Sequence, residues 1–181
     1  LDNSTTERHQ GVIAYVAPYA YFELDEVVNN LEINKDTTLL ILDHIEDPHN
    51  LGAIIRTAEA SGVKAIIIPK RRAAAVKASA GAIEHMPVIR VSNLTDAIKK
   101  LKEKGFWIAG TTLAERSEDY TKIAKDVPLA IVIGNEGEGM SKVVTNECDF
   151  LYHLPMLGKV QSLNVSVAAG IIMYERIKFN D

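Results

Sequence analysis

Several features are scarce in this sequence, and each scarcity excludes a class of protein. There is one cysteine, Cys148, with no C-x-x-C pair or Cys/His cluster beside it, so an internal disulfide is excluded. The uncharged stretch at residues 11–22 is too short to cross a bilayer and follows no basic segment, so we expect no membrane or secretion signal. The 20 Lys and Arg residues are outnumbered by 24 Asp and Glu, giving a net charge of −4. No global attraction to nucleic acid follows from that charge, and a cytoplasmic location is expected.

The rest of the composition is that of a folded domain. With 181 residues and a hydrophobic fraction of 47%, the chain can bury a sizeable core, which excludes intrinsic disorder. Residues 1–10 are polar and have no hydrophobic period, so we interpret them as a linker or tail. Residues 11–181 are expected to form one compact domain.

Apolar segments rich in Val and Ile alternate with helical patterns from about residue 37 onward. This alternation predicts an α/β fold. Several segments are apolar on both faces, as a parallel sheet covered by helices requires. The predicted strands are Leu39–Leu42, Ala65–Ile68, Val88–Val91, Phe106–Thr111, Leu129–Ile133 and Phe150–Leu154.

Capping signals identify the helices between these strands. The predicted helix Pro48–Ser61 has Asp47 at its N-cap and a proline at its first position, and it stops at Gly62. The segment Asn93–Lys104 repeats this design, with its lysines largely on the outer face. A further short helix is expected at Leu24–Leu31.

The last predicted helix has almost no polar face. Residues 160–174 contain no charge, and Leu163–Tyr174 is apolar nearly all round except for Asn164 and Ser166. A helix that is apolar on every side must be buried on every side, so we expect a central position or a subunit interface, with Ser162 favoured as the N-cap. Asn164 is then either a satisfied structural amide or part of a site.

Two loops have the composition of a ligand site. Residues 43–50 hold two histidines and three acids between a strand and a helix, but a proline breaks the spacing and the histidines belong to different elements, so we expect no metal. Residues 134–139, G-N-E-G-E-G, form a glycine-rich loop directly after a strand. Their order is not the dinucleotide G-x-G-x-x-G, and the glutamates would repel a phosphate. The loop suits an uncharged or cationic ligand that approaches the backbone closely, or it is a plain turn.

A basic cluster and one arginine each have two interpretations, and the context of one serine argues against a class of enzyme. The basic cluster Lys70-Arg71-Arg72 with Lys77 is either a solvated loop or a contact for a polyanion. Arg56 lies away from the apolar stripe of its helix, and is either a plain exposed arginine or a phosphate contact. Ser162 has no His/Asp partner in its sequence context, which argues against a hydrolase triad.

Three segments taken together resemble, in order and spacing, the three motifs of the SpoU (TrmH-like) RNA ribose methyltransferases. They are N-L-G-A-I-I-R at residues 50–56, I-G-N-E-G-E-G at residues 133–139 and L-P-M-L-G-K-V-Q-S-L-N-V-S at residues 154–166. The segment R-H-Q-G-V-I-A at residues 8–14 is similar to the one that enters the catalytic domain in the subgroup acting on 23S ribosomal RNA. The resemblance implies that residues 1–10 remain from a missing N-terminal RNA-binding domain.

The same resemblance implies a SPOUT fold, which is a parallel-sheet α/β domain with a C-terminal deep trefoil knot. It also implies a homodimer, an RNA substrate and S-adenosyl-L-methionine as cofactor. Carried over position by position, the residues that contact the cofactor are Thr111, Gly134, Leu154, Met156 and Leu163. The polar active-site residues are Asn50, Arg56, Glu136, Ser162 and Asn164.

A guanidinium stays protonated and is a poor general base, so we expect Arg56 to hold the adjacent phosphate and orient the ribose 2′-hydroxyl. The other four polar residues would hold Arg56 and the loops in place. The leading hypothesis is therefore methyl transfer to a ribose 2′-hydroxyl of RNA, most like a guanosine in 23S ribosomal RNA. The alternatives are a transfer RNA ribose 2′-O-methyltransferase, a knotted RNA-binding module without catalysis, and a nucleotide-binding oxidoreductase, which the glycine order disfavours.

Overall fold

The structure is a computed structural model that describes residues 21–72, 85–135 and 138–178. Several sequence predictions lie outside these residues. They are the tail at residues 1–10, the domain-entry segment at residues 8–14, Lys77 and Glu136.

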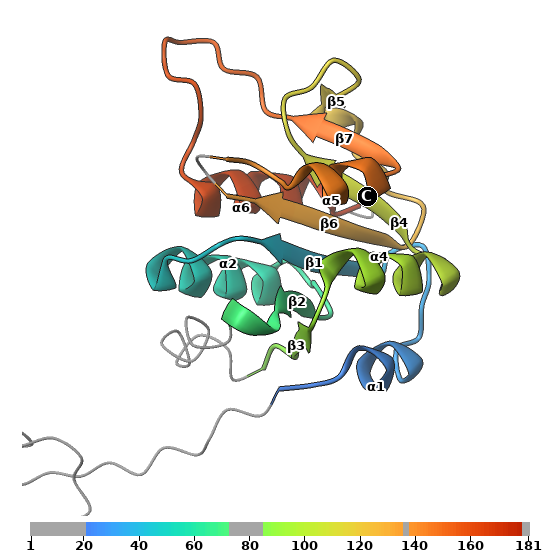
Figure 1. The fold of residues 1–181 in the computed structure, drawn as a ribbon. Coiled ribbons are helices and arrows are strands. Elements are labelled where there is room, and N and C mark those ends of the chain that lie inside the picture. The colour runs from blue at the N-terminus through green and yellow to red at the C-terminus, as the bar shows by residue number, and fades with distance from the viewer. Residues whose placement is uncertain (1–20, 73–84, 136–137, 179–181) are drawn as a thin grey trace, which may run out of the picture.

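The described strands form one seven-stranded sheet in the order β3-β2-β1-β6-β4-β7-β5, and every pairing is parallel. In the register, Leu40 of β1 lies between Ile66 of β2 and Ile131 of β6. Figure 1 shows β1 and β6 in the middle of the sheet. The strands are β1 (Thr38–Asp43), β2 (Ile66–Pro69), β3 (Val88–Val91), β4 (Trp107–Thr111), β5 (Glu118–Asp119), β6 (Leu129–Gly134) and β7 (Phe150–His153).

The predicted parallel α/β fold is confirmed. All six predicted strands are present, and no end differs from the prediction by more than one residue. The strand β5 was not predicted, because its two polar residues have no hydrophobic pattern and pair only with the edge of β7. Six buried residues in a row in β1, and again in β6, are the expected result of helices on both faces.

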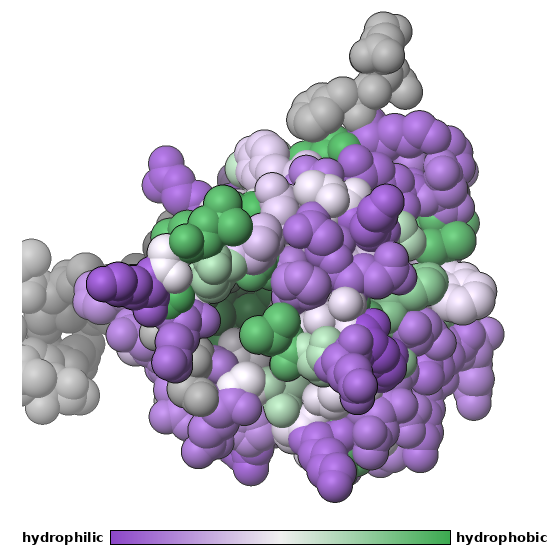
Figure 2. All heavy atoms as spheres, turned by 90° about the horizontal axis from the view of Figure 1, so that it is seen from above, coloured by the Kyte–Doolittle hydropathy of each residue, from purple (hydrophilic) through white to green (hydrophobic). Residues whose placement is uncertain are grey.

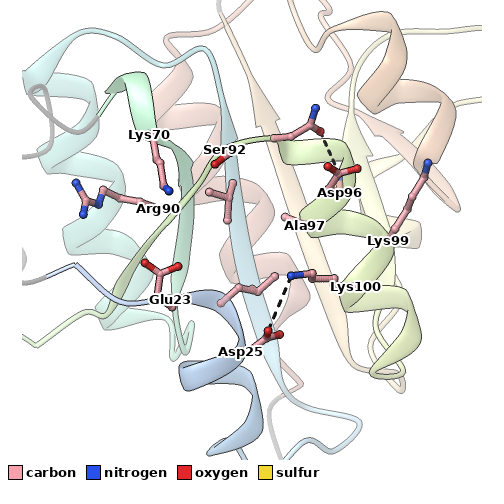
Figure 3. A pocket seen from close by; sticks show the side chains of 12 residues that line it. Glu23, Asp25, Lys70, Arg90, Ser92, Asp96, Ala97, Lys99 and Lys100 are labelled. Atoms are coloured by element: carbon pink, nitrogen blue, oxygen red, sulfur yellow. Dashed lines mark hydrogen bonds and ion pairs between the residues drawn. The ribbon is translucent and has the colours of Figure 1, made fainter.

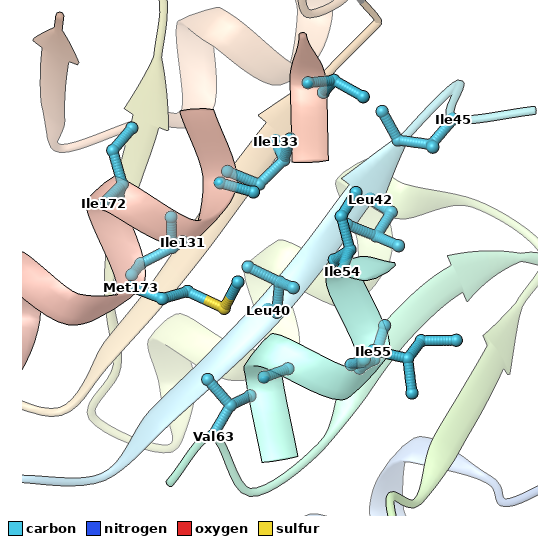
Figure 4. Packing of buried hydrophobic residues seen from close by; sticks show 14 of the residues in the cluster. Leu40, Leu42, Ile45, Ile54, Ile55, Val63, Ile131, Ile133, Ile172 and Met173 are labelled. Atoms are coloured by element: carbon cyan, nitrogen blue, oxygen red, sulfur yellow. The ribbon is translucent and has the colours of Figure 1, made fainter. Parts of the chain in front are cut away.

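Helices cover both faces of the sheet. Two helices, α2 (Pro48–Ala60) and α6 (Val165–Arg176), pack on one face, and α1 (Leu24–Asn29), α4 (Leu94–Glu103) and α5 (Lys142–Glu147) pack on the other. Short 3-10 turns, η1 (Lys70–Arg72) and η3 (Tyr120–Lys122), follow β2 and β5. Figure 4 shows the first of these layers, in which Leu40, Leu42, Ile131 and Ile133 of the sheet meet Ile54 and Ile55 of α2 and Ile172 and Met173 of α6.

The capping predictions for α2 and α4 are confirmed. The Asp47 side chain accepts hydrogen bonds from the backbone N–H groups of His49 at 2.7 Å and Asn50 at 3.3 Å. Gly62 follows α2 with a φ of +82°, a conformation that glycine adopts without steric cost. Asn93 caps α4 in the same way, by accepting from the backbone N–H of Asp96 at 3.1 Å.

The predicted N-cap of the last helix is wrong. α6 begins at Val165, and its N-cap is Asn164, whose side-chain oxygen accepts from the backbone N–H groups of Ser166 at 2.9 Å and Val167 at 3.3 Å. Ser162 lies two residues before this cap, outside the helix. A carboxamide oxygen is as good an N-cap acceptor as a serine hydroxyl, so the sequence favoured the wrong one of two suitable residues.

Of the two positions expected for this helix, a central position in one chain is wrong, and a subunit interface stays a prediction. Val167, Ile171 and Tyr174 have 51%, 37% and 46% of their surface exposed. Their spacing of four and three residues places them along one face of α6, while Ala169, Ile172 and Met173 are buried. Within one chain, only one side of the helix packs against the sheet and α2.

Among the described residues, no helix is both long enough and apolar enough to span a membrane. The single cysteine is free and buried on the face covered by α4 and α5. Burial raises the pKa of the Cys148 thiol to about 12, so almost none of it is thiolate at neutral pH.

Candidate functional site

A pocket of about 800 Å³ lies at the carboxyl edge of the sheet, beyond the ends of β4, β6 and β7. Its walls come from residues 111–113, from both ends of the glycine-rich loop after β6, and from the segment between β7 and α6. Figure 1 shows this last segment extending away from the body of the domain before the chain returns to α6. The carboxyl ends of parallel strands are where ligands bind in open α/β sheets, so the position alone marks a candidate site.

The pocket is lined by apolar side chains and by glycines. Figure 2 shows this side of the molecule hollowed, with hydrophobic residues gathered around the hollow. Among the described lining residues, Lys159 and His153 are the ones with a basic side chain, and none has a carboxylate. Glu138 of the glycine-rich loop is exposed and does not line the pocket. The pocket therefore fits a largely uncharged group, held by backbone polar atoms and apolar contact.

Gly134 is required by the loop itself. A β-carbon at this position would lie 2.5 Å from the carbonyl carbon of Gly139 and 2.5 Å from the backbone nitrogen of Met140. The loop closes on itself here, because Asn135 and Gly139 exchange two backbone hydrogen bonds of 3.2 and 2.8 Å. Any side chain at Gly134 would therefore open the loop, before any effect on a ligand.

Asp43 and His44, at the end of β1, hold this loop from outside. The Asp43 carboxylate is 1% exposed and accepts from the backbone N–H of Ser141 at 2.8 Å. The side-chain amide of Asn135 donates to the backbone carbonyl of His44 at 3.0 Å. The backbone of His44 is left-handed, with a φ of +65°. Sequence reasoning missed this support, although a buried acid at the end of a parallel strand was the signal that pointed to it.

All five residues assigned to the cofactor line the pocket: Thr111, Gly134, Leu154, Met156 and Leu163. The hydroxyl of Thr111 is already used, since it donates to the carbonyl of Val132 at 2.9 Å. Ser162, from the polar set, lines the same pocket.

Asn50, Arg56 and Asn164 lie outside the pocket wall. Asn164 donates from its side-chain amide to the side-chain oxygen of Asn50 at 3.2 Å, which joins the first turn of α2 to the N-cap of α6. Arg56 is exposed on α2 and makes no hydrogen bond or ion pair with any residue in the described parts of the chain. Glu136 lies outside the described residues. The structure thus brings Asn50 and Asn164 together, and neither of them bonds to Arg56.

Two further side chains at the pocket were not predicted. His153 shares a hydrogen bond of 2.9 Å between its Nδ1 and the hydroxyl of Ser117, which ties the chain after β4 to the end of β7. Tyr152 accepts from the backbone N–H of Ala124 at 3.1 Å, and burial raises the pKa of its phenol. Both residues give shape to the pocket, and no motif in the sequence marked them.

Comparison with known proteins gives matching results from family models and curated sequences. The model of the SpoU rRNA methylase family matches residues 37–174. A relative from Staphylococcus haemolyticus, named as a TrmH-family tRNA/rRNA methyltransferase, is 52% identical over 97% of this chain and 72% of its own length. A relative of the same name from Bacillus subtilis is 53% identical over the same shares.

Solved structures agree with these sequences. The AdoMet-bound rRNA methyltransferase from Sinorhizobium meliloti superposes with a TM-score of 0.75 at 31% identity, covering 87% of this chain and 60% of that one. The A. aeolicus TrmH/SpoU tRNA modifying enzyme superposes with a TM-score of 0.71 at 30% identity, covering 84% of this chain and 80% of that one. This chain therefore spans less than two thirds of the Sinorhizobium protein.

Proposed function

The chain belongs to the SpoU rRNA methylase family, and we propose that it transfers the methyl group of S-adenosyl-L-methionine to a ribose 2′-hydroxyl of RNA, with a guanosine of 23S ribosomal RNA as the acceptor. The enzyme class and the cofactor follow from the family and its AdoMet-bound structures. The acceptor is our proposal. The observation that carries the proposed methyl transfer is that all five residues assigned to the cofactor line one pocket at the carboxyl edge of the sheet.

The pocket fits the cofactor by size and chemistry. A volume of about 800 Å³ is within the range of small-molecule sites. Leu154, Met156 and Leu163 offer apolar contact to a purine ring, and the glycine-rich loop contributes Gly134 and Gly139, which have no side chain, to the pocket wall. S-adenosyl-L-methionine supplies an electrophilic methyl group when it is bound.

For the RNA substrate, we assign binding of a backbone phosphate to Arg56. Its guanidinium is exposed and has no partner among the described residues, so it is free to hold a phosphate with two parallel hydrogen bonds. The hydrogen bond between Asn50 and Asn164 fixes the first turn of α2 against the pocket segment. We assign Ser162 and Glu136 to holding the loops around the acceptor.

We further propose that the segments after β6 and β7 form the deep trefoil knot of a SPOUT domain. The similarity of the whole fold to SpoU/TrmH structures supports this, as does the fact that both segments wall the same pocket. A cytoplasmic location is part of the same proposal, since ribosomal and transfer RNA are modified there and the one cysteine of the chain is free.

We also propose a homodimer that buries the exposed stripe of α6. The stripe consists of Val167, Ile171 and Tyr174, whose exposure in one chain would be removed by a second copy with two-fold symmetry. Light scattering should give twice the chain mass, and Ile171→Glu should give the single mass. Val143→Glu is the matched control, because Val143 is 60% exposed on α5, away from the stripe. A monomeric wild-type protein would overturn the dimer.

A transfer RNA acceptor is the second candidate. The curated relatives are named as tRNA/rRNA methyltransferases, and a tRNA modifying enzyme is among the similar structures. Mapping 2′-O-methylated sites in ribosomal and transfer RNA from a deletion strain separates the two, because the lost site identifies the acceptor.

Calorimetric titration with S-adenosyl-L-methionine, with NAD as the comparison, tests the function in general. Binding of the first and not the second, together with methyl incorporation into RNA, is the expected result. Cofactor binding without methyl incorporation into any cellular RNA would favour a non-catalytic RNA-binding module instead.

A further inference from the structure

A second pocket lies at the carboxyl edge of the sheet, beyond the ends of β1 and β2. Its volume is about 520 Å³, and none of its lining residues lines the pocket assigned to the cofactor. One wall is η1, a second is the start of α4 with the residues before it, and a third is Asp43 with His44. Because Asp43 and His44 also hold the glycine-rich loop, the two pockets share a structural support.

Arg71 is held in this second pocket by His44. One guanidinium nitrogen of Arg71 is 2.5 Å from Nε2 of His44, and Nδ1 of the same imidazole is hydrogen-bonded to the Asp43 carboxylate. A guanidinium only donates and a carboxylate only accepts, so the imidazole accepts at Nε2 and donates at Nδ1. This arrangement orients Arg71 through a neutral ring, while an acid at the same position would cancel its charge.

The pocket presents positive charge and neutral polar groups. Among the described residues, no carboxylate forms an ion pair with Arg71 or Lys70. The one acid in the wall, Asp43, is 1% exposed and has its oxygens engaged by Ser141 and His44. The opposite wall contributes Ser92, Asn93 and Thr95. Cationic side chains beside hydroxyls and an amide are the groups that bind phosphate oxygens.

A third pocket extends this surface. It has a volume of about 480 Å³ and shares Lys70, Ser92 and Asn93 with the second. Figure 3 shows Lys70 and Ser92 at its upper end, with Arg90, Lys99 and Lys100 along its sides. Its charges are more balanced, because Glu23, Asp25 and Asp96 also line it and Lys100 lies 3.9 Å from Asp25. Two joined pockets with cations along their length suit a chain of phosphates better than one small anion.

We propose that the second pocket binds a backbone phosphate of the substrate RNA next to the target nucleotide, with Arg71 and Lys70 as its cationic contacts. This inference rests on the proposed function, because it names the surface by which the same enzyme holds its RNA. His44 is then a positioning residue, which fixes Arg71 and joins the RNA contact to the loop of the cofactor pocket.

The test compares the wild-type chain with Arg71→Ala, Lys70→Ala and the double variant. The probe is a mixed-sequence RNA oligonucleotide about 20 nucleotides long, titrated across a salt series. We expect the double variant to bind about tenfold more weakly at moderate salt and to lower the salt slope by about 1 to 1.5, as for two lost phosphate contacts. The matched control removes two exposed cations elsewhere, Lys104→Ala with Lys122→Ala, and should keep the slope.

Cofactor titration separates this proposal from the one on which it rests. A wild-type chain that does not bind S-adenosyl-L-methionine contradicts the proposed function, whatever the RNA results. A double variant that binds the cofactor normally and keeps wild-type RNA affinity and slope overturns the phosphate pocket alone. Inorganic phosphate that competes with RNA at equal affinity would also overturn it, because the pocket would then be a site for a small anion.

His44→Gly tests the positioning role. Glycine keeps the left-handed backbone at φ +65° and the carbonyl that Asn135 contacts, while removing the imidazole. We expect KM for RNA to rise with kcat little changed, and Arg71→Ala to have a smaller effect in this background than in the wild type. Equal effects of Arg71→Ala in both backgrounds would overturn the role of His44.

Discussion

The two ends of α6 lie at opposite edges of the same sheet. The polar side chain at one end is buried and fully hydrogen-bonded, whereas the one at the other end is exposed. At the end of the helix, Arg176 is 4% exposed and donates to Thr38 and to the backbone carbonyls of Lys35, Thr37, Ala124 and Val127. At its start, Asn164 is exposed and bonds to Asn50 and to its own helix. The first end ties three segments of the chain together in the interior, and the second joins α6 to α2 at the surface, beside the cofactor pocket.

The two arginines Arg176 and Arg56 differ in the same way, since one is buried with acceptors and the other is exposed without any in the described parts of the chain. Burial lowers the pKa of the Arg176 guanidinium, but five acceptors compensate the buried charge, so this residue is structural. Arg56 is exposed and has no acceptor among the described residues, so its guanidinium is available to a ligand. Polar groups that the fold satisfies stabilise it, and exposed ones without a partner among the described residues are candidates for function.

The largest expected effect comes from removing the buried hydrogen bonds of Arg176 at the C-terminal end of α6. Arg176→Ala would leave buried carbonyls and the Thr38 hydroxyl without a donor, and we expect a loss of about 3–5 kcal/mol in the free energy of unfolding. Urea unfolding followed by circular dichroism measures it. Lys178→Ala is the control, because Lys178 is a cation near the same end of α6 that pairs with Asp126 in solvent. The unfolding midpoint of this variant should equal that of the wild type. Equal midpoints for Arg176→Ala and wild type would contradict the structural role.

The next effect separates the two arginines by function. Arg56→Lys keeps the charge and loses the planar fork that holds a phosphate with two bonds, so we expect kcat/KM for RNA methylation to fall about 100-fold. Stability and cofactor affinity should stay at wild-type values, because the exposed Arg56 makes no hydrogen bond or ion pair with the described residues that the change would remove. Methylation at the wild-type rate would remove Arg56 from the mechanism, and a matched loss of cofactor binding would move it to the cofactor site.

Asn164 has a structural and a functional bond, and two variants separate them. Asn164→Ala removes the cap of α6 and should cost about 1–2 kcal/mol of unfolding free energy. Asn164→Asp keeps the capping oxygen but cannot donate to Asn50, so it should keep most of the stability and still reduce methylation. If Asn164→Asp methylates RNA like the wild type, the bond to Asn50 serves the fold alone.

The sequence was most informative where one local rule decides the structure. Asp47 before a proline is sufficient to start α2, and the Val- and Ile-rich runs are sufficient for six strands. It was misleading where two residues satisfy the same rule, as Ser162 and Asn164 do for the cap of α6. Apolar composition likewise allowed a central position or a subunit interface for α6, because composition does not say which side of the helix meets the sheet.

Contacts between residues far apart in the chain could not be predicted. Arg176 meets carbonyls more than a hundred residues away, and His44 connects Arg71 to Asp43, so neither role has a local pattern. The reason for Gly134 also changed, because the space it leaves is filled by the loop's own backbone at Gly139 and Met140. The family resemblance named Gly134 as a site position, and the structure supplies the physical reason for the glycine.

The smallest expected effect comes from a substitution in the middle of α6, at a residue that lies away from both Arg176 and Asn164. Gly170 lies inside the helix opposite α2, and a β-carbon there would be 3.6 Å from the methyl carbon of Thr57, an ordinary contact distance. Gly170→Ala should therefore fit without movement and raise the free energy of unfolding by about 0.5–1 kcal/mol, because alanine loses less backbone entropy in a helix. The gain should appear equally in the wild type and in Asn164→Ala, since the two positions are more than one helical turn apart and share no partner. A loss of stability would mean that α2 and α6 pack more closely than this distance allows, or that a second chain contacts Gly170.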